Sequence, residues 1–77
     1  MDPQAWIEAW VAQRRPAEDV RLSADTDLYK TGLLDSLGII ELIEALEDHY
    51  GILFTDEEMQ AGLTNVADFE KAIRSRS

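Results

Sequence analysis

A single serine, Ser36, stands directly before the apolar and acidic run LGIIELIEALED, which contains no basic residue. The period of this run predicts a helix. Ser36 would then lie at a helix N-terminus, where unpaired N–H groups and the positive end of the helix dipole stabilise a phosphate group. Two interpretations follow: Asp35 or Ser36 only caps the helix, or the Ser36 hydroxyl is a chemical handle that holds a phosphoester. The local pattern alone favours the cap.

Hydrolysis by Ser36 needs a base within hydrogen-bond reach, and the chain has only one histidine. His49 lies 13 residues further along the predicted helix, which places it about 20 Å from the serine. The segment LLDSLG also lacks the G-x-S-x-G turn that exposes a nucleophile above a sheet. We therefore expect a protein that is not an enzyme.

A metal site is not predicted either. The segment DTDLYK at 25–30 begins like an EF-hand loop, but Tyr29, Lys30 and Ser36 occupy positions that need an oxygen ligand, a glycine and a glutamate. The acids at 56–58 fit the first turn of a helix, where they complement its dipole. Because cysteine is absent, thiolate metal sites and disulfides are excluded.

Length and charge limit the class of protein and its partners. The 77 residues suffice for one small domain, predicted over 1–77, with a thin core. The net charge of −9 repels nucleic acid and anionic lipid. No apolar stretch approaches the roughly 20 residues that cross a bilayer. We expect a cytoplasmic monomer that has no nucleic-acid partner and no membrane span.

The acidic residues are concentrated in the second half of the chain. Ten Asp and Glu and no Lys or Arg fall between Lys30 and Lys71. Part of the surface must therefore be strongly negative. Such a surface either keeps the protein soluble or binds a basic partner.

The first helix and the loop after it must position Ser36. Asp2 followed by Pro3 predicts a helix start, and the helix should end near Arg14 and Arg15, before Pro16. The loop is long, and we expect one helical turn in it, closed by Gly32. Five apolar residues are predicted to anchor the loop in the core: Leu22, Leu28, Tyr29, Leu33 and Leu34.

The second helix is predicted over 36–50, with Gly51 as a left-handed cap. One of its faces should be core: Ile39, Leu42, Ile43, Leu46 and Tyr50. The opposite face is an acidic ridge that begins with a leucine: Leu37, Glu41, Glu44 and Asp48. This second face meets solvent or a partner.

The last part of the chain predicts two more helices and no strand. Thr55 and Glu58 have the form of a capping box for a short third helix that ends near Gly62. Asn65 opens the fourth, and 51–54 is predicted to be a loop against the core. The fourth helix has inward apolar residues and a basic end: Val66, Phe69 and Ile73, then Arg74 and Arg76. The expected fold is an all-α, small four-helix bundle with a long first loop and a short third helix.

The segments that carry these features resemble the acyl carrier proteins over nearly the whole chain. DSL stands at the start of the acidic second helix, and EL follows five residues after Ser36. ALE at 45–47, HYGI at 49–52 and a T-x-V-x-D-hydrophobic pattern at 64–69 complete the likeness. With this resemblance, the interpretation of Ser36 as a functional handle is favoured over the plain cap.

The resemblance implies a carrier that has no catalytic activity of its own. Ser36 would receive 4′-phosphopantetheine from coenzyme A through a phosphopantetheinyl transferase, with Asp35 and Leu37 as parts of the attachment motif. The terminal thiol of the arm would hold an acyl or aminoacyl group as a thioester. An adenylating ligase that activates an acyl group or an amino acid would load it, and a downstream transferase or synthase would unload it. The surface that meets basic patches of these enzymes would comprise Leu37, Glu41, Glu44, Glu47 and Asp48.

Two features of the chain depart from fatty-acid carriers. Gly38 stands where those carriers usually have an acidic residue, which removes one docking charge. Gly32 lies four residues before the serine, as in the D-alanyl carrier proteins and other discrete aminoacyl carriers. The cargo therefore stays open between an amino acid and a specialised acyl unit. The alternative function is a small acidic helical adaptor that binds a partner through the Leu37–Asp48 face without a cofactor.

Overall fold

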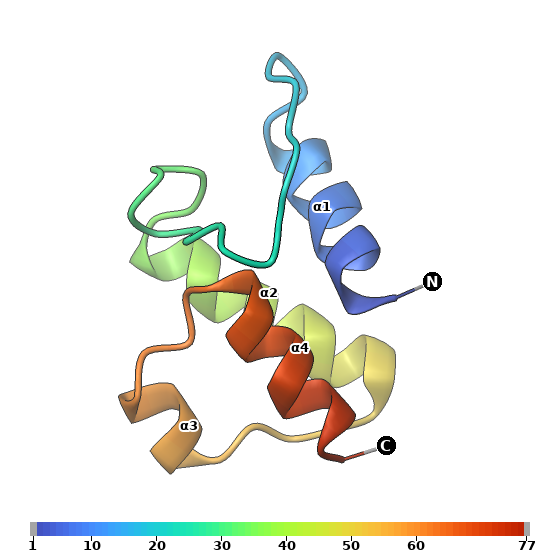
Figure 1. Ribbon diagram of the computed structural model, residues 1–77, viewed down its shortest axis with the longest axis vertical. Helices are drawn as coiled ribbons and strands as arrows, with labels where there is room; N and C mark the ends of the chain where they lie inside the picture. The colour runs from blue at the N-terminus through green and yellow to red at the C-terminus, as the bar shows by residue number, and fades with distance from the viewer. Residues whose placement is uncertain (1, 77) are drawn as a thin grey trace.

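The computed structural model describes residues 2–76 and contains four helices, with no strand in that range (Figure 1). The helices are α1 (Pro3–Arg14), α2 (Ser36–Tyr50), α3 (Asp56–Gln60) and α4 (Val66–Arg74). The all-α architecture predicted from the sequence is therefore confirmed. None of these helices has the length and apolarity that a membrane span needs.

Helix α1 begins and ends where its sequence predicts. The Asp2 carboxylate accepts a hydrogen bond from the Ala5 N–H at 2.9 Å, and Pro3 occupies the first turn. Ile7 and Val11 are fully buried, and α1 lies against α4. Burial of this apolar stripe, rather than helix propensity, holds a helix of this length in place.

The long connection from α1 to α2 is fastened to the chain that precedes α4. Leu28 N–H donates to the Thr64 carbonyl at 2.8 Å, and Val66 N–H donates to the Thr26 carbonyl at 3.0 Å. An isolated antiparallel bridge pairs Asp27 with Asn65 between these bonds. Figure 1 shows the connection rising from the end of α1, returning past the helices and looping once more before α2. The entry to α2 is thus fixed by backbone bonds to a distant segment.

Three of the five predicted anchors of this connection are buried, and one prediction was wrong. The buried anchors are Leu22, Leu28 and Leu34, whereas Leu33 is half-buried. Tyr29 is 51% exposed. The reason is the turn that Asp27 closes: its carboxylate accepts from the N–H groups of Tyr29 and Lys30. Leu28 enters the core, and its neighbour Tyr29 points outward. As predicted, Gly32 ends this turn, with a φ of 79° that a side chain would disfavour.

The core lies between the apolar faces of α1, α2 and α4. The predicted inward residues of α2 are buried: Ile39, Leu42, Ile43 and Leu46. Tyr50 is only half-buried at the edge of this core, and burial raises the pKa of its hydroxyl. Phe69 of α4 is fully buried and meets Phe54 edge to face, with ring centroids 6.3 Å apart. The loop residue Phe54 is therefore part of the core, as predicted for 51–54, although Leu53 beside it is exposed.

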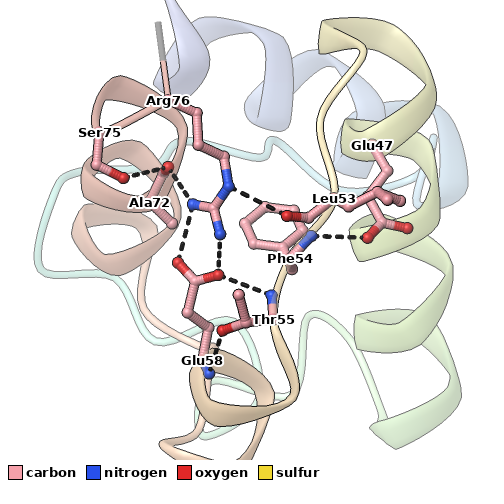
Figure 2. A network of polar contacts seen from close by, with 8 residues as sticks. All are labelled: Glu47, Leu53, Phe54, Thr55, Glu58, Ala72, Ser75 and Arg76. Atoms are coloured by element: carbon pink, nitrogen blue, oxygen red, sulfur yellow. Dashed lines mark hydrogen bonds and ion pairs between the residues drawn. The ribbon is translucent and has the colours of Figure 1, made fainter.

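The short helix α3 buries none of its own side chains, and a polar clamp holds it instead (Figure 2). The predicted capping box between Thr55 and Glu58 is present. The Glu58 carboxylate also forms an ion pair with the guanidinium of Arg76, which donates to the carbonyls of Leu53 and Ala72 as well. The sequence predicts Arg76 only as a charge near a helix end. The structure shows that it fastens the end of the chain to α3.

This clamp predicts a pH-dependent contribution of Glu58 to stability. Hydrogen bonds from Arg76, and then from the Thr55 backbone, lower the pKa of the Glu58 carboxyl from 4.5 to about 2. The stabilisation is therefore complete above pH 4.5 and is lost as the pH falls toward 2. Chemical denaturation should show Glu58→Gln less stable than wild type at pH 7, with the difference disappearing over that range.

The neighbouring exposed acid gives the matched control for this prediction. Glu57→Gln removes an equal charge from α3 but leaves the Glu58–Arg76 pair intact. The difference in unfolding free energy between this variant and wild type should change little between pH 7 and pH 2. Equal pH profiles for the two variants would contradict a stabilising role of the clamp.

Candidate functional site

Ser36 is the first residue of α2, and its side chain is exposed. The capping function belongs to its neighbour, because Asp35 Oδ1 accepts a hydrogen bond from the Gly38 N–H at 2.7 Å. The structure records no hydrogen bond for the Ser36 hydroxyl within residues 2–76. The two interpretations drawn from the sequence thus apply to two adjacent residues. Asp35 caps the helix, and Ser36 presents a free hydroxyl where the helix dipole favours a negative group.

Gly38 supports this cap by having no side chain. A Cβ atom at this position would lie 3.2 Å from Asp35 Oδ1 and 3.2 Å from two atoms of Leu34. The glycine is buried, and Leu34 packs against it in the first turn of α2. The sequence indicates only that a docking charge is missing here. The structure shows in addition that the Cβ of an acidic residue at position 38 would be in tight contact with Leu34 and the Asp35 carboxylate.

Loss of the Asp35 cap should destabilise the protein measurably. Removing an N-cap acceptor by substitution with alanine typically costs about 1 kcal/mol. Asp35→Ala is therefore expected to lower the unfolding free energy by about that amount in urea denaturation. Asp35→Asn retains a side-chain acceptor, so its unfolding free energy should fall much less. If both variants were as stable as wild type, the cap would not contribute to folding.

The outer face of α2 combines apolar and acidic side chains: Leu37, Ile40, Glu41, Glu44 and Asp48. Leu37 is 63% exposed and Ile40 is 53% exposed. Ile40 is not among the residues predicted to meet partners, although its spacing of three residues from Leu37 places both on one side of a helix. Exposed apolar side chains next to the site residue are typical of a surface that meets partners.

The five residues predicted to bind partners do not have equal environments. Glu41 forms an ion pair with Arg14 of α1 at 2.9 Å. Glu47 is half-buried, and its Oε2 accepts from the Phe54 N–H at 2.9 Å, which secures the loop after α2. Glu44 and Asp48 are exposed, and no ion pair of either is recorded within residues 2–76. The free negative charge of the outer face therefore belongs to Glu44 and Asp48.

His49 lies at the opposite end of α2 from Ser36. Its ring stacks on Trp6 of α1, with centroids 4.7 Å apart, and meets Tyr50 edge to face. This packing gives it a structural partner far from the serine. Within residues 2–76, no group of three or more His, Asp or Glu side chains is placed to hold a metal ion.

Comparisons with known proteins agree with this geometry. Residues 6–73 match the family described as phosphopantetheine attachment site. The chain is 33% identical over 67 residues to an acyl carrier protein of Helicobacter pylori, covering 87% of this chain and 85% of that protein. It is 51% identical over 35 residues to a D-alanyl carrier protein of Streptococcus mutans, covering 46% and 44% of the two chains. The chain belongs to the phosphopantetheine attachment family, whose members are non-catalytic carriers that a phosphopantetheinyl transferase modifies covalently with 4′-phosphopantetheine.

Proposed function

We propose that Ser36 is the residue that receives 4′-phosphopantetheine, and that the chain carries an acyl or aminoacyl group on this arm between enzymes. The free and exposed hydroxyl of Ser36 is the observation that supports this most directly. The family match contains only one other serine, Ser23, whose hydroxyl lies 3.2 Å from the Thr26 hydroxyl. Of these two serines, only Ser36 combines a free hydroxyl with a helix N-terminus.

The attachment reaction needs little from this chain beyond the hydroxyl and its position. In the proposed reaction Ser36 Oγ would attack the β-phosphorus of coenzyme A, so that a new O–P bond forms while the pyrophosphate P–O bond breaks and adenosine 3′,5′-bisphosphate leaves. The hydroxyl proton passes to a base of the transferase, because His49 lies at the other end of α2. The N-terminus of α2 would stabilise the negative phosphodiester that results. When bound, the arm supplies the thiol on which the cargo forms a thioester.

The outer face of α2 is the proposed docking surface for the partner enzymes. These partners are the phosphopantetheinyl transferase, an adenylating ligase that loads the arm, and a downstream transferase or synthase with a basic patch. Leu37 and Ile40 offer apolar contact next to Ser36, and Glu44 and Asp48 offer unpaired negative charge. Charge complementarity of this kind speeds association and weakens with salt, as a shuttle that must leave each enzyme requires.

The names of the relatives indicate two classes of cargo, acyl groups and amino acids. One compared protein is named an acyl carrier and another a D-alanyl carrier. The absence of cysteine leaves the arm as the only thiol. Incubating the modified protein with acyl-activating and amino-acid-activating ligases would separate the two cargo classes by mass. A cytoplasmic location stays a prediction.

Incubation of the unmodified protein with coenzyme A and a promiscuous phosphopantetheinyl transferase tests the proposed attachment. Intact mass spectrometry should show the addition of one phosphopantetheine per chain. A known carrier protein in the same reaction serves as the positive control. An unchanged mass with several transferases that all modify the control would contradict the proposed function.

A further inference from the structure

A polar pocket of about 300 Å³ opens beside the attachment residue, between the end of α1 and the segment that enters α2. Its lining comes from these two segments: Arg14, Arg15, Gly32, Leu33, Leu34 and Asp35. Because Asp35 directly precedes Ser36, the pocket begins one residue from the hydroxyl proposed to carry the arm. Of this lining, only Asp35 has a role in the proposed attachment site, as the cap of α2.

Arg14 brings free hydrogen-bond donors to the pocket. Within residues 2–76 its guanidinium makes one recorded hydrogen bond, to Glu41 Oε1 at 2.9 Å, and lies over the Trp10 ring at 4.9 Å from the centroid. Most of its N–H donors are therefore unused. The side chains of this ion pair are 38% and 44% exposed. Such an exposed pair is weak and leaves the guanidinium able to bind a second acceptor.

Arg15 has a buried side-chain donor without an acceptor. Its terminal nitrogens donate to the Leu33 carbonyl at 3.4 Å and to the Glu18 carboxylate at 2.6 Å. Its Nε is buried and has no hydrogen-bond partner within residues 2–76. A buried donor without an acceptor costs free energy. A ligand that brings an acceptor into this pocket would recover that free energy.

The chemistry of the arm matches this pocket better than it matches the outer face of α2. The arm begins with a negative phosphodiester and continues with a hydroxyl and two amides, all of which accept hydrogen bonds. The outer face presents the unpaired negative charges of Glu44 and Asp48, and the sequence from 31 to 70 contains no Lys or Arg. The pocket offers two guanidinium groups, which keep unused donors although each is paired with one carboxylate, and its own carboxylate, Asp35, already accepts from the Gly38 N–H. The start of the arm therefore finds donors here that the outer face of α2 lacks.

We infer that Arg14 and Arg15 bind the phosphodiester and the adjoining polar part of the arm on Ser36, in the pocket they form with Gly32, Leu33, Leu34 and Asp35. This inference rests on the proposed function. Its consequence is that the base of the arm lies on the α1 side of Ser36. Leu37 and Ile40 then stay clear for partner enzymes.

Nuclear magnetic resonance of isotope-labelled protein, before and after modification, tests this binding without any enzyme assay. We expect nuclear Overhauser contacts between the geminal methyl groups of the arm and protons of Leu33 or Arg14. The Nε–H signals of Arg14 and Arg15 should shift on modification. In Arg14→Gln with Arg15→Gln these contacts should be lost. In Arg21→Gln, which removes a largely exposed arginine that pairs with Asp19 in the same connection, they should persist.

The intact mass of every sample distinguishes a failure of this inference from a failure of the proposed function. If wild-type protein is fully modified but shows neither the contacts nor the shifts, the inference is overturned and the proposed function stands. If wild-type protein is not modified by any transferase, the proposed function itself fails. The wild-type contacts decide the inference even if the double variant does not fold.

Discussion

Ser36→Ala is expected to abolish the addition of phosphopantetheine completely while changing the unfolding free energy by less than about 0.5 kcal/mol. The hydroxyl makes no recorded bond within residues 2–76, and the Asp35 cap does not depend on it. Alanine also has the highest intrinsic helix propensity. Intact mass after incubation with coenzyme A and a transferase measures the first effect, and urea denaturation measures the second.

Ser23→Ala is the matched control, because it removes another exposed hydroxyl from the matched part of the chain. It should be modified as fully as wild type. Modification of the Ser36→Ala protein would mean that another residue accepts the arm. The cofactor-free adaptor makes the opposite functional prediction: its partner would bind wild type and Ser36→Ala equally well, and the mass of neither would change.

The helices could be predicted because short local sequence patterns determine where they begin and end. The caps at Asp2 and Asn65, the capping box at 55–58 and the left-handed Gly51 each satisfy backbone groups within a few residues. The period of the second helix fixes its buried face. These signals need no knowledge of distant contacts, and the structure confirms them.

Contacts between distant segments could not be predicted in this way. Arg76 and Glu58 form an ion pair because the segment after α4 lies beside α3. No local sequence pattern indicates this pair. Tyr29 was expected in the core from its apolarity, but the turn at Asp27 directs it outward. Both cases depend on the path of a loop, which periodicity does not encode.

The sequence predicts a capped helix start at the proposed attachment site, but it does not assign the cap to one residue. The sequence leaves open whether Asp35 or Ser36 caps α2, since both residue types cap helices well. Only the bond from the Gly38 N–H to Asp35 assigns the cap and frees the serine. Likewise, the acidic ridge was predicted from spacing, while the pairing of Glu41 with Arg14 needed the position of α1.

Because Glu41 is paired with Arg14, a test of docking should reverse the charges of Glu44 and Asp48 instead. Glu44→Lys with Asp48→Lys is expected to lower kcat/KM of the transferase and of the loading ligase about tenfold or more, because electrostatic steering changes association rates by that order. The salt dependence of kcat/KM should also become flatter. Both side chains are exposed and free of ion pairs within residues 2–76. Lysine at 48 also suits the C-terminal end of α2, so the fold should persist.

Asp19→Lys with Asp25→Lys is the control with the same change in net charge, placed in the first loop instead of on α2. If long-range charge alone mattered, both double variants would lose activity equally, and a specific docking surface would be contradicted. If docking uses the outer face of α2, kcat/KM falls about tenfold or more only for the variant at Glu44 and Asp48. Adding Glu41→Lys to that variant should have a smaller further effect, because the Glu41 carboxylate is half-buried and lies beside the Arg14 guanidinium in the free protein.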